Sequence, residues 1–246
     1  MHAWRSLTIR STGTGAASHR HQRGFSARPA ILWAPGLVET DDRRYERLGA
    51  KIRAMCRDSA GPGYCVVGAR GEIALGNTLR GLASASELAK SPIEFMVRWH
   101  EEQEGRALRF RCQIHESWGE WKQRWFQLDS RVRKPLSVTP NTDVEKLAEA
   151  MAVTHRKLSG VAFELNPNNN AVLSIAAKAL ATTPRKAHRE EIGAGLVCAL
   201  RWPSMDHKEA STRVYGHVYW RTPPDENWEV PPQSGRTASS PARDSG

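Results

Sequence analysis

The feature of this sequence that most limits its fold is a pattern of predicted elements that occurs twice. Residues 31–116 and residues 134–222 each predict the order strand, helix, strand, helix, strand, strand. Such self-similarity indicates a duplicated supersecondary unit, and the alternative is chance similarity. The sequence therefore predicts an α/β (α+β) fold made of two tandem β-α-β-α-β-β units.

The first unit is predicted from alternating apolar strands and helical periodicity. Its first helix, residues 41–58, carries apolar residues at helical spacing: Tyr45, Leu48, Ile52 and Met55. The second helix, residues 72–89, is rich in small residues. The strand segments are ILWAPGL (31–37), YCVVGA (64–69), PIEFMVRWHEE (92–102) and RALRFRCQIHE (106–116).

The second unit repeats this order with different residues. Its first helix, residues 143–158, places Val144, Leu147 and Met151 on one side, and the segment 166–184 predicts an asparagine-rich turn that leads into a second small-residue helix. The strand segments are KPLSVTPNT (134–142), GVAFEL (160–165), GLVCALRWPSM (195–205) and RVYGHVYWRT (213–222).

Matching residues support the duplication beyond the order of elements. The offsets between equivalent positions are close to one another: 99 residues for Leu48 and Leu147, 98 for Arg80 and Lys178, and 103 for Trp99 and Trp202. A difference of a few residues requires only insertions in surface loops, which tolerate them.

The two ends of the chain differ in composition from the units between them. Residues 1–30 contain five Arg and no Asp or Glu, and RGFSAR resembles the Arg-x-Phe-Ser type of mitochondrial processing site. This composition predicts a mitochondrial presequence and a location in the matrix; the alternative is a basic arm that contacts nucleic acid. Residues 223–246 are rich in Pro, Ser, Gly and charge, and predict a disordered tail.

Charge and cysteine usage narrow the function classes. The net charge is +10, and the longest apolar runs are too short for a membrane-spanning helix, so we expect no membrane contact. The four cysteines show no zinc-binding spacing, so we expect no metal or cofactor and interpret them as small apolar side chains in a reducing compartment: Cys56, Cys65, Cys112 and Cys198.

The segment PLSVTPNTDVEKLAEAMAVTHRKLSGVAFELNPNNNAVLSIAAKALA (135–181) is similar to stage V sporulation protein S, of the Alba superfamily. VTPNTDVEKLA matches that family's entry into its first helix, and SIAAKALA with Lys178 matches its second helix. In the first unit, GARG and NTLRGLA with Arg80 resemble the same turn and helix. The tandem arrangement also resembles kinetoplastid mitochondrial RNA-binding proteins of this superfamily. The resemblance implies nucleic-acid binding, usually of RNA, without catalysis.

Each strand-to-helix turn is a candidate phosphate site. A helix N-terminus presents unpaired N–H groups that favour an anion, and Arg70 and Arg80 add positive charge in the first unit, as Lys178 does in the second. The stretch GARGEIALG matches neither nucleotide-binding glycine motif. In the second unit NPNNN replaces the glycines, and asparagine can form the turn and cap the helix. The alternative for each turn is a tight connection without ligand.

Two further basic segments are candidate nucleic-acid contacts. The linker 117–133 places Trp121 and Trp125 beside Lys122 and Arg124, a mixture suited to stacking on bases and binding phosphate; alternatively these aromatics clamp the two units together. After the second helix of the second unit, a basic run is a phosphate candidate or a solvated loop: Arg185, Lys186 and Arg189.

The sequence predicts no enzyme, because His100 and His115 lie near carboxylates but no nucleophile setting or metal motif accompanies them. We expect a mitochondrial RNA-binding protein that acts in RNA stability, processing or maturation, with DNA binding left open. The alternative is a structural or scaffold subunit of the mitochondrial ribosome or of an RNA-processing complex.

Overall fold

The computed structural model describes eight segments of the chain: residues 31–36, 44–58, 63–102, 105–114, 135–158, 160–187, 195–201 and 214–221. The predicted presequence, the linker 117–133 and the predicted tail lie outside these segments.

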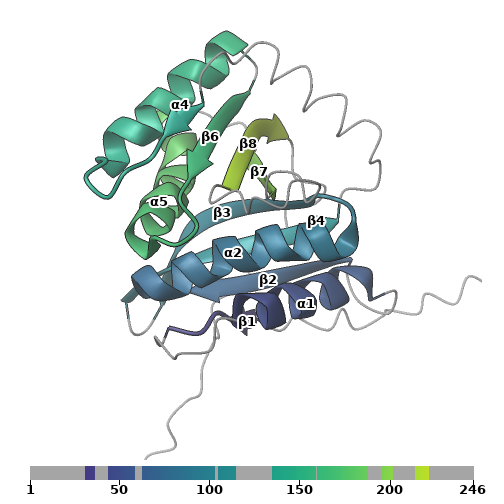
Figure 1. The fold of residues 1–246 in the computed structure, drawn as a ribbon. Coiled ribbons are helices and arrows are strands. Elements are labelled where there is room, and N and C mark those ends of the chain that lie inside the picture. Colours follow the sequence, from purple (N-terminus) through teal and green to yellow (C-terminus); the bar gives the residue numbers. More distant parts are fainter. Residues whose placement is uncertain are drawn as a thin grey trace, which may run out of the picture.

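The described residues form eight strands and four helices, so the expected α+β class is confirmed (Figure 1). The elements up to residue 114 are β1 (Ile31–Trp33), α1 (Arg44–Arg57), β2 (Tyr64–Ala69), α2 (Gly71–Ala89), β3 (Ile93–Glu102) and β4 (Gly105–Ile114). The later ones are β5 (Leu136–Ser137), α4 (Val144–Leu158), β6 (Val161–Leu165), α5 (Asn170–Lys186), β7 (Gly195–Arg201) and β8 (Val214–Arg221).

All eight strands belong to one mixed sheet with the order β1-β2-β4-β3-β7-β8-β6-β5. The short outer strands β1 and β5 pair in parallel with β2 and β6, and every other pairing is antiparallel. The two halves of the chain meet at the centre, where Glu94, Phe95 and Met96 of β3 pair with Ala199, Cys198 and Val197 of β7.

The helices cover one face of this sheet. Alternate residues of the strands, such as Phe95, Phe110, Phe163 and Cys198, join the helices in one continuous buried core. Helix α2 packs against α1 and α5, and α5 packs against α4, so the helices form a connected layer (Figure 1). Residues of both halves therefore share a single hydrophobic core.

Close approach of α2 and α5 depends on a residue without a side chain. A Cβ atom placed on Gly76 of α2 would collide with the Asn170 side chain at the start of α5. Gly68 of β2 has a related role, because an added Cβ would lie 2.9 Å from the Trp33 ring. The structure thus gives Gly68 a packing function, in the turn region where sequence analysis suggested backbone contact with phosphate.

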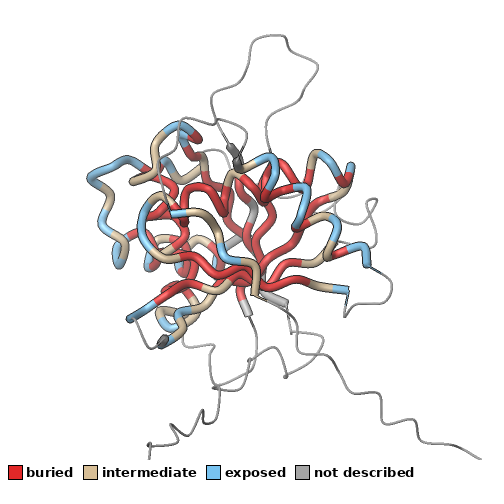
Figure 2. Tube along the Cα trace, turned by 90° about the horizontal axis from the view of Figure 1, so that it is seen from below, coloured by how far each residue is buried: buried red, intermediate tan, exposed pale blue. Residues whose placement is uncertain are grey.

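Most residues of the central strands are buried (Figure 2). Because alternate residues of a strand point to opposite faces, these include residues on the face away from the helices. Glu94 has no exposed surface and Arg111 is 4% exposed. The Arg111 guanidinium lies 4.1 Å above the Tyr64 ring, and Gln113 Nε2 donates a hydrogen bond to Glu94 Oε2 at 3.3 Å. Arg111 and Glu94 therefore each contact a neighbouring side chain on this face.

Candidate nucleic-acid interface

The turns that precede α2 and α5 are built differently. Arg70 occupies the N-cap position of α2 with an extended backbone and no side-chain cap, and Gly71 follows with φ +79°. At α5, the Asn169 side chain accepts a hydrogen bond from Val172 N at 3.2 Å. Asparagine therefore caps the second helix, which confirms that part of the prediction.

Arg80 lies between the two halves. From α2 its Nε donates to Pro167 O at 2.6 Å, its Nη2 to Asn170 Oδ1 at 2.6 Å, and its Nη1 to Asn77 Oδ1 at 3.0 Å. Asn77 Nδ2 in turn donates to Pro35 O at 3.0 Å. Burial lowers the pKa of the Arg80 guanidinium from its ordinary value. The guanidinium of Arg80 thus serves as a polar link between α2 and the start of α5.

Lys178, which the sequence pattern matched to Arg80, lies on α5. Its side chain is half-buried, and its helix packs against α2. The structure therefore brings the helices of Arg80 and Lys178 together, and it places Arg70 at the N-cap of α2.

The basic pair Arg185 and Lys186 lies in the last turn of α5, whereas sequence analysis placed it after the helix. The helix continues past Pro184 because a cap forms beyond it: Ala187 N donates to Thr183 O at 3.0 Å and to Pro184 O at 3.1 Å. Two cations also stabilise the negative end of the helix dipole.

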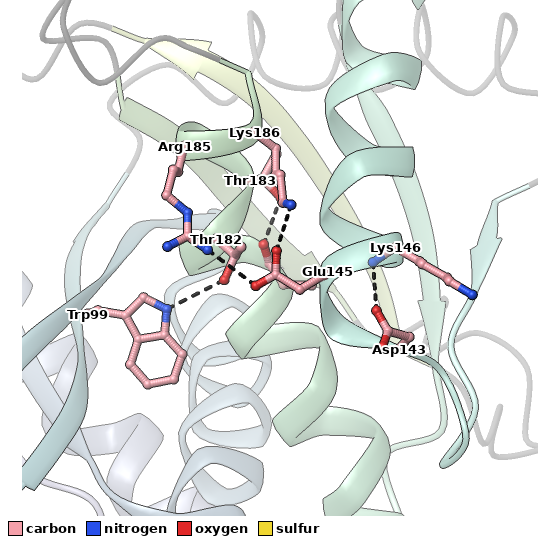
Figure 3. Close-up of polar contacts among 9 residues, drawn as sticks. Trp99, Asp143, Glu145, Lys146, Thr182, Thr183, Arg185 and Lys186 are labelled. Carbon is pink, nitrogen blue, oxygen red and sulfur yellow. Dashed lines mark hydrogen bonds and ion pairs between the residues drawn. The ribbon is translucent and has the colours of Figure 1, made fainter.

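Both cations share one carboxylate of the neighbouring helix (Figure 3). Arg185 Nη2 lies 3.2 Å from Glu145 Oε1, and Lys186 Nζ lies 2.8 Å from Glu145 Oε2. The hydrogen bond from Lys186 lowers the pKa of the Glu145 carboxyl, so this group stays ionised at neutral pH. The ion pairs are exposed, and pairs of this kind contribute little to stability.

An aromatic side chain that sequence analysis used only as a repeat marker lies beside this pair. Trp99 of β3 is 36% exposed, and its Nε1 is 3.5 Å from Thr182 Oγ1 of α5 (Figure 3). The Arg106 guanidinium lies 5.2 Å from the Trp99 ring centroid and 2.9 Å from Glu101 Oε1. This corner therefore combines an exposed indole with cations from both halves of the chain.

A signal for Trp99 was present in the strand pattern. Ile93, Phe95, Val97 and Trp99 alternate on the helix-facing side of β3, and their exposed fraction rises from 0% at Ile93 to 36% at Trp99. A strand that extends beyond the helices covering it leaves inward residues near its end partly uncovered. The length of the covering helix could not be compared with the strand before the fold was known.

Three arginines of β3 and β4 were also not singled out from the sequence. Arg98 of β3 lies directly opposite Arg109 of β4, and Arg111 opposite Met96, all on the sheet face away from the helices. Arg98 and Arg109 are half-buried and Arg111 is buried. The spacing of arginines in RALRFRCQ was the available signal, since alternate residues of a strand share a face.

The other predicted contact residues lie outside the described part of the chain: Trp121, Lys122, Arg124, Trp125 and Arg189. Within the described part, no three His, Cys, Asp or Glu side chains gather to hold a metal ion. No helix there is both long enough and apolar enough to cross a membrane.

Comparison of the chain with protein-family models, with curated proteins and with solved structures gives no match.

Proposed function

We propose that the chain consists of two tandem Alba-like units, residues 31–116 and 134–222, which together form one sheet. In each half the described elements follow the order β-α-β-α-β-β. From the outer strand inward, the first half has the order β1-β2-β4-β3 and the second half has the order β5-β6-β8-β7. These two orders correspond strand by strand, and the halves meet where β3 lies beside β7. Equivalent helices α2 and α5 also pack against each other.

We further propose that the protein is a non-catalytic RNA-binding protein of the mitochondrial matrix, acting in stability, processing or maturation of transcripts. The observation that carries this proposal is the exposed corner where Arg185 and Lys186 of α5 adjoin Trp99 and Arg106 of the first half. Cations beside an exposed aromatic suit phosphate contact and stacking. The net charge of +10 favours association with a polyanion.

Arg80 favours a second candidate, a scaffold subunit of a ribonucleoprotein complex. This residue matches the basic position of the second helix in the resembling family, yet its guanidinium is occupied by contacts within the chain. A scaffold would use the same two-unit framework to bind protein partners, and its basic residues would serve folding.

Titration of the full chain with single-stranded RNA at two salt concentrations distinguishes these functions. Replacing Arg185 and Lys186 by Ala should weaken binding at low salt and reduce the slope of log K against log salt by about 1.4, because each phosphate contact on a single strand contributes about 0.7. The matched control is Arg156→Ala with Lys157→Ala, an exposed basic pair at the end of α4. Absence of RNA binding by the unaltered chain at low salt would leave the scaffold function.

A further inference from the structure

The indole of Trp99 is held in a fixed place but is not buried. Its Nε1 is anchored toward Thr182 of α5, and the ring keeps 36% of its surface exposed. An indole that served only the core would be covered more fully, as Phe95 is at 1% on the same strand face. The fold therefore presents a partly exposed aromatic ring near the end of β3.

Cations surround this ring on two sides. Arg106 lies over the ring, and its side chain is 63% exposed, so its position is not fixed by packing. Arg185 and Lys186 are three and four residues after Thr182 on α5, which places all three on one side of the helix. Figure 3 shows Trp99, Thr182 and the basic pair in the same corner.

The carboxylate of Glu145 opposes an anion at this corner. It contacts both cations of α5 and is itself 53% exposed. A phosphate that binds Arg185 and Lys186 must replace Glu145 as their partner, and the small free energy of exposed ion pairs permits this exchange. The Glu145 carboxylate therefore competes with a phosphate for Arg185 and Lys186.

We propose that Trp99 is a base-stacking platform for single-stranded RNA, and that Arg185 and Lys186 bind the adjoining phosphate in exchange for Glu145. The assignment rests on the proposed RNA-binding function and adds the class of RNA. The exposed surface of an indole can stack on an unpaired base, whereas bases in a duplex are already stacked on their neighbours. The protein should therefore bind RNA with unpaired bases more tightly than duplex RNA.

Stacking is tested with fluorescein-labelled oligouridine and a blunt RNA duplex of the same length, titrated against the full chain. The unaltered protein should bind the single strand more tightly, and Trp99→Ala should weaken that binding about tenfold while Trp99→Phe retains most of it. The control is Trp33→Phe, at an exposed tryptophan (46%) of the outer strand β1, which should leave binding unchanged. Equal losses on the single strand and the duplex with Trp99→Ala would overturn the stacking assignment.

Competition is tested separately with Glu145→Gln, which does not depend on the stability of the Trp99 variants. Removing this charge should tighten single-strand binding about three- to fivefold, on the scale of an exposed ion pair. Glu149→Gln, at an exposed carboxylate one turn further along α4, is the control and should have little effect. Equal affinities of the two variants would overturn the exchange at Glu145.

If the unaltered chain binds neither RNA, the proposed function itself fails. If it binds RNA and Trp99→Ala changes nothing, only the stacking platform at Trp99 fails.

Discussion

Arg80 illustrates how one arginine can join two halves of a chain. Its planar guanidinium donates in three directions at once, to a backbone carbonyl and to two asparagine side chains. A lysine has a single nitrogen and could not span this arrangement. Because the acceptors are partly buried, they depend on Arg80 for their hydrogen bonds.

Replacing Arg80 by Ala should therefore lower the free energy of unfolding by about 1–3 kcal/mol, since partly buried acceptors would lose their donor. Urea denaturation followed by circular dichroism measures this change. Lys178→Ala, at a half-buried basic residue of α5, is the matched control and should cost less. Equal destabilisation by the two substitutions would show that the three hydrogen bonds contribute little.

The comparison of Arg80 with Lys178 also shows what sequence can and cannot predict for single residues. The sequence predicted that both residues lie in helices, and they do, in α2 and α5. It could not indicate that Arg80 reaches Pro167 and Asn170, because these partners are 87 and 90 residues away in the chain. Only the packing of α2 on α5 brings them together.

At the scale of elements, a cluster of thiols fills the junction of α1, β2 and β4. Cys56 Sγ lies 3.7 Å from Cys65 Sγ and donates to Cys112 O at 3.3 Å, and Cys65 pairs with Cys112 across the two strands. All are free and buried, as is Cys198. These thiols act as core side chains, consistent with the sequence interpretation.

Because of these buried thiols, we expect the free energy of unfolding to fall at alkaline pH. Thiol–thiol hydrogen bonding and burial raise the pKa of Cys56 and Cys65 above the ordinary value of 9.0, and burial raises that of Cys112 and Cys198. Below pH 9 both the folded and unfolded chains hold these protons, so stability is unaffected. Above it the unfolded chain ionises first, and the free energy of unfolding should fall as pH rises.

Urea midpoints at pH 8 and pH 10 measure this dependence. Lysine and tyrosine also titrate in this range, so the control is a variant in which Cys56 and Cys65 are both replaced by Ala. Its absolute stability will be lower, but its loss between the two pH values should be smaller. An unchanged pH dependence would contradict a contribution from these thiols.

Most elements were predictable from hydrophobic periodicity, because α1 and α4 carry regular apolar stripes and β2 and β6 are short apolar runs. Their ends were less predictable. Pro184 suggested a helix end, but proline in a last turn is tolerated when the residues after it complete the cap. The outer strand β5 contains two residues within a longer extended segment, since only those residues pair with β6.

At the scale of the whole molecule, the sequence predicted two units but not how they join. Their common core and the pairing of β3 with β7 arise from contacts between residues about 100 positions apart. No local periodicity encodes such a contact. The exposed corner at Trp99 likewise forms only where the two halves of the chain pack together, because it combines residues of both.

A shared core predicts one cooperative unfolding transition. Circular dichroism and tryptophan fluorescence should report the same urea midpoint. Phe110→Ala in the first half and Phe163→Ala in the second, both fully buried, should each lower the free energy of that single transition by about 3–5 kcal/mol. Two separate transitions, with each substitution affecting only one of them, would show that the halves fold independently.

The placement of the shortest strands at the two outer positions has a consequence for self-association. Strands β1 and β5 offer three and two residues of pairing, whereas the inner hairpin strands β3 and β4 have ten each. An outer strand with few backbone groups is a poor template for recruiting another molecule's strand. The two longest strands, β3 and β4, are paired on both sides within the sheet. The short outer strands should therefore disfavour the addition of strands from other molecules and growth into fibrils.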